Sequence, residues 1–79
     1  MFRLSQKETE ILRFIRTSRH KTTVHEIARG LNLAPSEVEV FVKALLHQKL
    51  LNLAPGMRPS DDAYYTNPER REEIYELLG

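Results

Sequence analysis

The stretch "NLAPSEVEVF", from Asn32 to Phe41, decides how the rest of the chain is interpreted. Asparagine is one of the few residues that take the left-handed conformation in which many helices end. Pro35 follows closely and suits the first position of a new helix. The stretch therefore predicts two helices that meet at a tight turn. The second helix opens with two acids, Glu37 and Glu39, which bear directly on what that helix can bind.

The helix after this turn is predicted from "PSEVEVFVKALLHQ", residues 35–48. Its apolar residues recur at i, i+3, i+4, i+7 and i+8, the spacing of one buried helix face. They are Val38, Phe41, Val42, Leu45 and Leu46. The residue before the helix is Ala34, whose side chain has no oxygen with which to cap a helix. We therefore expect tertiary contacts to support the start of this helix.

Two earlier helices are predicted from capping boxes, in which Ser or Thr is followed three residues later by Glu. "SQKETEILRFIRTS" begins with Ser5 and contains Glu8, and "TTVHEIARGL" contains Thr23 and Glu26 at the same spacing. Both segments carry apolar residues at helical intervals. The sequence therefore predicts a longer first helix, followed by a short second helix that ends at the turn.

The C-terminal third predicts a hairpin and a last helix. "LLNLA" and "AYYT" are short strand candidates, and "PGMRPSDD" between them is rich in turn-forming residues. We expect a two-stranded hairpin over about residues 50–66. Asn67 then suits a helix cap, while Pro68 and Glu69 suit a first helical turn. The last helix is expected over about residues 68–78.

This order of elements resembles the winged helix-turn-helix, and most of all the MarR type of bacterial and archaeal regulators. The segments that carry the resemblance are "IARGLNL", "SEVEVFVKALLHQKLL" and "YYTNPE". The resemblance implies a mainly α fold with a three-helix core, a two-stranded wing and a C-terminal helix. A single domain over residues 1–79 is expected, with its helix-turn-helix at about residues 23–48.

Composition narrows the class of protein. A chain of 79 residues fits one small domain, and without cysteine it can form neither a disulfide nor a thiolate zinc site. His20, His25 and His47 lack the spacing of a metal site, and no glycine-rich phosphate loop is present. No apolar run approaches the roughly 20 residues that span a bilayer. We expect a soluble cytoplasmic protein that is not an enzyme and holds no cofactor or metal.

The charge of the chain is unevenly distributed, although its net value is only +1. Residues 1–30 hold seven Lys or Arg against three acids, whereas residues 67–79 hold two against four. The densest basic cluster is "RTSRHK", residues 16–21. Such a cluster is typical of a solvated surface and also of contacts with nucleic-acid phosphates.

The helical period also predicts the outward side of the third helix. Opposite the apolar stripe lie Ser36, Val40, Lys43 and His47, with the two glutamates on the shoulders to either side. Glu39 precedes Lys43 by four residues, a spacing that favours an ion pair. An exposed valine at the centre of this side favours contact with a base or with another protein over simple solvation.

The resemblance implies where DNA would bind, because the helix after the turn of a winged helix enters the major groove. Carried over to this chain, the base contacts are expected from Ser36, Glu39, Val40, Lys43 and His47, and a wing contact from Arg58. Contacts with the DNA backbone are expected around the second helix, from Arg16, Arg19, Lys21, Thr23, His25 and Arg29. We therefore predict a small transcriptional regulator that binds double-stranded DNA.

Alternatives remain at this stage. The shoulder glutamates and a wing with one basic residue also suit a winged helix that docks a protein partner within a larger complex. The basic cluster would suit RNA equally well. The apolar side of the last helix would either pair two copies into a homodimer or cap the first helix and the hairpin; it comprises Ile74, Tyr75, Leu77 and Leu78.

Overall fold

The computed structural model describes residues 4–79. The predicted domain start at residue 1 and Arg3 of the basic N-terminal half lie outside the described residues. In chain order the elements are α1 (Gln6–Thr17), β1 (Thr22–Thr23), α2 (Val24–Leu31), α3 (Pro35–His47), β2 (Leu51–Ala54), β3 (Ala63–Thr66) and α4 (Arg71–Leu78), with 3-10 turns at Pro59–Asp61 and Pro68–Arg70. The fold is mainly helical with a small antiparallel sheet, as the sequence predicts.

Local capping sets the starts of α1 and α2. At α1, the Glu8 backbone N–H donates to Ser5 Oγ at 3.2 Å, and the Ser5 N–H donates to Glu8 Oε1 at 3.0 Å. Thr23 and Glu26 form the same reciprocal pair at the start of α2. Each pair satisfies N–H groups that a helix start leaves without partners. Both predicted capping boxes are confirmed.

The turn between α2 and α3 also forms as predicted. Asn32 adopts φ 57° and ψ 49°, which is the left-handed conformation, and α3 starts three residues later at Pro35. Ala34 makes no side-chain hydrogen bond to the helix. Helix α3 instead packs against α1, α2 and β2. Its inner side is buried at Val38, Val42 and Leu45, so tertiary contacts hold this helix in place.

The sheet has three strands, whereas the sequence predicts two. Strand β3 lies in the middle, with β2 on one side and the two-residue strand β1 on the other, all antiparallel. Thr22 pairs with Tyr64 and Thr23 with Ala63. The expected two-stranded wing is therefore corrected to a three-stranded sheet whose β2–β3 hairpin forms the wing.

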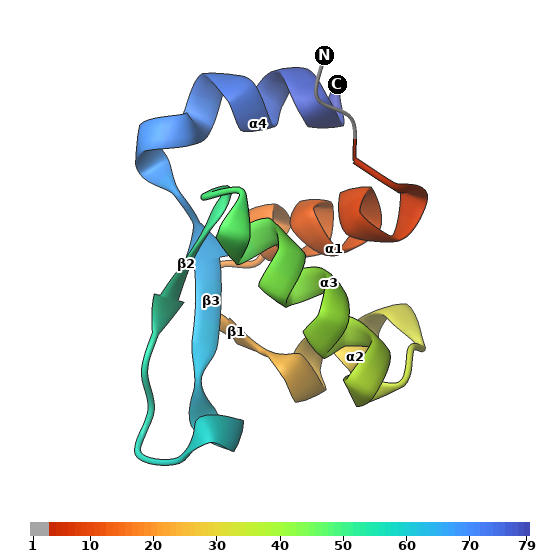
Figure 1. Ribbon diagram of the computed structural model, residues 1–79, viewed down its shortest axis with the longest axis vertical. Coiled ribbons are helices and arrows are strands. Elements are labelled where there is room, and N and C mark those ends of the chain that lie inside the picture. Colours follow the sequence, from red (N-terminus) through yellow and green to blue (C-terminus); the bar gives the residue numbers. More distant parts are fainter. Residues whose placement is uncertain (1–3) are drawn as a thin grey trace.

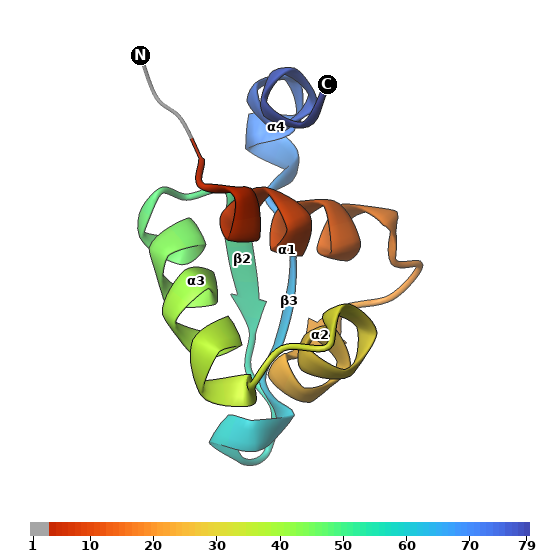
Figure 2. The ribbon, with the colours of Figure 1, turned by 90° about the vertical axis from the view of Figure 1, so that its right-hand side faces the viewer.

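One core unites these elements. Its buried side chains come from α1, α2, α3, α4 and the segment that enters β2, and they are Ile11, Leu12, Ile15, Ile27, Ala28, Val38, Val42, Leu45, Leu50, Leu51, Ile74 and Leu78. In Figures 1 and 2, α4 lies at one end of the long axis and the wing tip and the start of α3 lie at the other. The protein thus presents its predicted binding elements at the end opposite α4. None of the helices within residues 4–79 has the length and apolar character needed to cross a membrane.

Helix α4 starts later than predicted. Asn67 Oδ1 accepts the N–H of Glu69, so the cap forms, but residues Pro68–Arg70 make a 3-10 turn before α4 begins at Arg71. On its inner side Ile74 and Leu78 are buried. The Arg13 guanidinium of α1 donates to the Leu78 carbonyl oxygen at 3.0 Å, which ties the end of α4 to the body.

Candidate nucleic-acid interface

The outward face of α3, formed by Ser36, Val40, Lys43 and His47, is exposed along its whole length. Val40 at its centre is 64% exposed, although valine is among the residues most often buried in proteins. The predicted orientation of these four side chains is confirmed. They offer a hydroxyl, an apolar surface, an ammonium group and an imidazole in a line along one helix.

The two glutamates beside this face differ in their surroundings. Glu37 is half-buried, and Glu39 is exposed. The predicted ion pair between Glu39 and Lys43 is absent from the ion pairs found among residues 4–79. A surface pair at this spacing contributes only a few tenths of a kcal/mol, too little to hold two long side chains together. On the neighbouring wing, burial raises the pKa of Tyr64, and the charges of Asp62 and then Glu39 raise it further.

A hollow of about 480 Å³ lies where α2 turns into α3. We call it the turn hollow; it is lined by His25, Glu26, Ala28, Arg29, Asn32, Leu33 and Pro35. The two basic side chains of this lining, His25 and Arg29, are exposed. The start of α3 beside it has no side-chain cap, and helix starts carry partial positive charge. Pro35 has no N–H and the Glu37 N–H donates to the Ala34 carbonyl oxygen at 3.0 Å, so in the first turn the N–H of Ser36 is the one left for an outside acceptor. The turn hollow therefore combines two basic side chains with an uncapped helix start.

The wing tip is held by its acids. The Gly56 N–H donates to Asp62 Oδ1 at 2.9 Å, and a Cβ at Gly56 would come within 2.5 Å of the Cβ of Asp61, so the tip requires glycine there. Arg58, the predicted wing contact, is 81% exposed and pairs with Asp61 at 3.6 Å. Exposed pairs of this kind contribute between about 0 and 1 kcal/mol, so Arg58 can exchange its partner for a phosphate at little cost.

Three other predicted backbone contacts lie elsewhere. Arg16, Arg19 and Lys21 line a hollow of about 660 Å³ on the sheet. We call it the basic hollow; its lining includes Arg16, Arg19, His20, Lys21, Tyr65 and Thr66. Figure 2 shows the loop between α1 and β1 at the edge of the molecule opposite α3. Arg16 lies on α1, and Arg19 and Lys21 lie in the loop before β1, where the neighbouring His20 contacts Glu26 of α2. The DNA contacts expected from these three residues stay a prediction.

Thr23 and His20 have structural partners. The Thr23 hydroxyl accepts the Glu26 N–H and lies 3.3 Å from Glu26 Oε1, so it is engaged in the cap. His20 Nε2 lies 2.9 Å from Glu26 Oε2. Hydrogen bonds from His20 and from the Thr23 backbone lower the pKa of Glu26. Sequence reasoning missed Tyr65 and Thr66 as neighbours of the basic cluster, because only the pairing of β1 with β3 brings them together.

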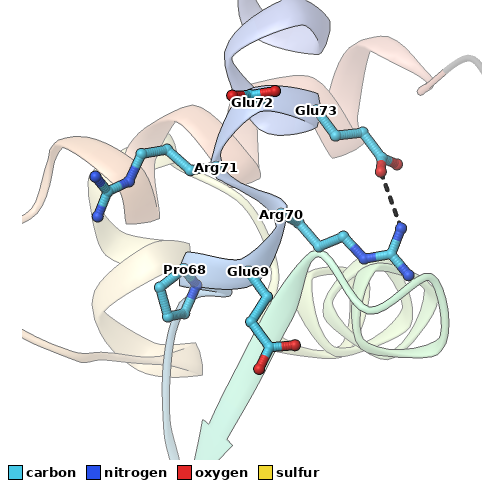
Figure 3. A pocket seen from close by; sticks show the side chains of 6 residues that line it. All are labelled: Pro68, Glu69, Arg70, Arg71, Glu72 and Glu73. Atoms are coloured by element: carbon cyan, nitrogen blue, oxygen red, sulfur yellow. Dashed lines mark hydrogen bonds and ion pairs between the residues drawn. The ribbon is translucent and has the colours of Figure 1, made fainter.

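The hollow at the start of α4 does not form a site. It is lined by six consecutive residues, Pro68 to Glu73, which include two arginines and three glutamates. Figure 3 shows these side chains diverging from one another. Arg70 forms an ion pair with Glu73, with a guanidinium nitrogen 3.0 Å from Glu73 Oε1. No group of three or more potential metal ligands gathers within residues 4–79. The exposed, convergent groups of the described chain are thus those of α3, the turn hollow and the basic hollow.

Comparison with known proteins identifies the fold. No protein-family model and no curated protein matches the sequence. Among solved structures, Staphylococcus aureus MarR in complex with salicylate and kanamycin is similar, with a TM-score of 0.80 at 21% identity over 95% of this chain and 49% of that one. A Listeria innocua protein of unknown function gives 0.77 at 19% identity over 92% and 50%.

A third similar structure is the DNA-binding TubR fragment from Clostridium botulinum, with a TM-score of 0.70 at 16% identity over 96% of this chain and 99% of the fragment. The chain spans about half the length of the first two proteins and nearly all of the third. These likenesses confirm the winged helix-turn-helix fold with a MarR-like arrangement.

Proposed function

We propose that this chain binds double-stranded DNA through α3 and acts in transcriptional regulation, as a cytoplasmic protein without enzymatic activity. The observation that carries the proposal is the outward face of α3, on which Ser36, Val40, Lys43 and His47 are all exposed. An α-helix fits the major groove, where each base pair presents a distinct pattern of donors, acceptors and methyl groups. The wing tip and the turn between α2 and α3 lie toward the same end of the molecule as the start of α3 (Figure 1).

The turn hollow supplies the contact that would fix α3 on the DNA backbone. His25 and Arg29 line it, and the uncapped start of α3 opens beside it. A phosphate there would gain a charged hydrogen bond from Arg29 and would take the place of the missing cap. Helices α1 and α2 both have capping boxes, whereas α3 has no side-chain cap. The absence of a capping side chain at Ala34 would then leave room for a phosphate.

Base contacts follow from the chemistry of the outward face. Val40 suits the methyl group of thymine, and Lys43 suits the acceptors of guanine. Glu39, on the shoulder, can accept a hydrogen bond from the amino group of cytosine. Arg58 of the wing would contact a phosphate after leaving Asp61. In this arrangement the backbone contacts position the helix and the side chains of α3 select the sequence.

The test is a salt titration of binding to duplex DNA. Each phosphate contact contributes a slope of about −0.9 in the logarithm of affinity against the logarithm of salt concentration. Lys43→Ala should weaken binding about 10-fold, corresponding to the 1–3 kcal/mol of a base contact. Lys7→Ala, on the first turn of α1 and outside both hollows, is the matched control and should bind as the wild type does. Absence of binding at low salt, or equal losses in the two variants, would refute the proposal.

A protein partner is the second candidate, favoured by the 64% exposure of Val40 and by the glutamates beside it. Exposed apolar side chains inside a polar rim are typical of protein interfaces. Here Val40→Asp should abolish capture of the partner at high salt, whereas Lys43→Ala should leave it intact. A loss of DNA binding in Lys43→Ala as well as in Val40→Asp supports the first candidate, because both side chains are then needed.

The proposal includes a homodimer formed through α4. Tyr75 is 68% exposed on this helix, and it borders a hollow of about 330 Å³ together with Arg16, Arg71 and Ile74. An aromatic ring beside an apolar and basic hollow suits a self-complementary contact about a two-fold axis. A monomeric mass in sedimentation equilibrium would contradict it.

A further inference from the structure

The basic hollow concentrates positive charge that nothing else in the described chain neutralises. Arg16, Arg19 and Lys21 take part in none of the ion pairs found among residues 4–79. The lining of the hollow includes no Asp or Glu. Glu26 contacts one lining residue, His20, at 2.9 Å, and Glu26 itself is not part of the lining. Unpaired charges so close together repel one another, and an anion seated among them would relieve that repulsion.

The walls of the hollow combine these charges with a half-buried aromatic ring. Lys21 Nζ lies 5.3 Å from the centroid of the Tyr65 ring, within the range of a cation–π contact. This contact holds the lysine over the sheet and leaves its N–H groups free for an acceptor. Thr66 on β3 adds a hydroxyl at the same edge. Lys21 of the loop between α1 and β1 is thereby placed over β3, and Arg16 and Arg19 line the same hollow.

The shape of the hollow favours a polymer over a small molecule. Small ligands bind in concave sites that enclose most of their surface. Here Arg16, Arg19 and Lys21 are all exposed on an open hollow of about 660 Å³, which cannot enclose a small anion. Exposed basic side chains spread over an open surface suit the evenly spaced phosphates of a nucleic-acid backbone, which bind with release of counterions.

The position of the hollow decides which duplex it can reach. The loop between α1 and β1, which carries Arg19 and Lys21, lies at the edge opposite α3 (Figure 2), and the molecule measures 35 × 24 × 22 Å between Cα atoms. One turn of duplex is about 34 Å long, and DNA of that length behaves as a stiff rod. A duplex seated on α3 therefore cannot bend around the protein into the basic hollow.

We propose that the basic hollow is a second surface for duplex DNA, which binds the phosphate backbone without regard to sequence, so that one chain holds two duplexes. Only the first of these duplexes rests on the function proposed above. The second depends on Arg16, Arg19 and Lys21 alone. A chain with two such surfaces would link separate DNA segments.

The experiment counts duplexes per chain by native mass spectrometry at low salt, with an excess of a duplex of about 12 base pairs, roughly one turn. Wild type should bind two duplexes per chain. Arg19→Gln combined with Lys21→Gln should bind one, because two of the three phosphate contacts of the hollow are lost. The slope of the second binding step against salt should be about −2.7 in wild type, for three phosphate contacts, and the double variant should show no second step at the same DNA concentration.

A charge-matched control removes the same net charge elsewhere. Lys7→Gln combined with Lys49→Gln alters α1 and the turn between α3 and β2, outside the basic hollow and outside the hollow beside α4, and should still bind two duplexes per chain. Thermal melting of all variants verifies that each one folds. A variant that melts early is replaced by Arg19→Gln alone, which should lower the slope of the second step by about one.

Every outcome separates the two proposals. One duplex per chain that is lost in Lys43→Ala and retained in the double variant overturns the second surface and keeps the first. One duplex that is lost in the double variant and retained in Lys43→Ala supports the basic hollow and overturns the function proposed for α3. Two duplexes in the double variant, or a second place taken by duplex RNA and refused by DNA, overturns the inference drawn here.

Discussion

The outward face of α3 and the basic hollow are opposite edges of one small fold, and they differ in how charge is arranged. On α3, one lysine stands among Ser36, Val40 and His47, with acids on both shoulders. In the basic hollow, three unpaired cations stand together and no acid lines the surface. The first surface is chemically varied and nearly neutral, whereas the second is uniform and strongly positive.

This difference indicates a division between selectivity and general attraction. Acids beside a DNA-contacting helix repel phosphates, so such a helix binds well only where base edges offer partners that compensate. A uniformly basic surface is attracted to any phosphate backbone and gains most of its free energy from released counterions. The glutamates at the start of α3 therefore fit a surface that rejects most sequences, and the basic hollow fits one that accepts all of them.

The largest expected effect removes both surfaces at once, because they rest on the same core. Leu45 lies on the inner side of α3 and is fully buried. Leu45→Ala should lower the free energy of unfolding by about 2–5 kcal/mol, through lost burial and the cavity left behind. In urea denaturation the midpoint should fall sharply, and both DNA-binding steps should be lost together.

The control for this substitution lies two residues away. His47 is exposed on the outward face of the same helix, and His47→Ala should change stability by no more than about 0.5 kcal/mol. A Leu45→Ala variant that loses one binding step and keeps the other would break the comparison, because it would mean that the two surfaces fold separately.

Much of α3 and its surroundings follows from local sequence. The capping boxes, the left-handed Asn32 and the helix start at Pro35 are all set by residues within a few positions of one another. The outward direction of Val40 and Lys43 follows from the helical period alone. Features of this kind are predictable because neighbours in the chain determine them.

The basic hollow is different because its walls come from distant parts of the sequence. Thr22 pairs with Tyr64 across 42 positions, and a strand of two residues has no periodicity to detect. The sequence shows that Arg16, Arg19 and Lys21 are close in the chain, but only the sheet places them beside Tyr65. The predicted Glu39–Lys43 pair does not form, because the spacing places both residues on one side of the helix and does not fix the conformations of two exposed side chains.

A substitution at Thr23, which lies between the two surfaces, should have a smaller effect on stability and on DNA binding. Thr23 belongs to β1 and also caps α2, the helix that lines the turn hollow. Thr23→Ala should cost about 1 kcal/mol of stability, the usual value for a lost cap. It should also weaken DNA binding through α3, because α2 carries His25 and Arg29.

Ser5→Ala is the matched control, since Ser5 caps α1 with the same hydrogen bonds at the other end of the three-helix core. It should lower the melting temperature by a similar amount and leave the affinity for DNA unchanged at temperatures where the protein is folded. Equal losses of affinity in both variants would show that stability alone governs binding, and the link between Thr23 and the turn hollow would then be wrong.

The smallest expected effect concerns pH, and it acts on the residue that joins the two surfaces. Glu26 holds His20 beside the basic hollow and caps Thr23 at the start of α2. The hydrogen bond from His20, followed by that from the Thr23 backbone, lowers its pKa below 4.5. The unfolded chain therefore binds the proton more readily, so the stabilisation by the carboxylate is complete above pH 4.5 and disappears as the pH falls through the lower value.

Glu26→Gln isolates this contribution, because glutamine preserves the capping box and does not titrate. Urea midpoints of wild type and variant should differ slightly at about pH 6 and converge as the pH falls through the lowered pKa of the Glu26 carboxyl, since that carboxyl is the only difference that titrates between them. The difference should be small, because the Glu26 side chain is 44% exposed and water screens its charge. A difference that persists unchanged at low pH would show that His20 and Thr23 do not act through the charge of Glu26, and that the two surfaces are joined there by shape alone.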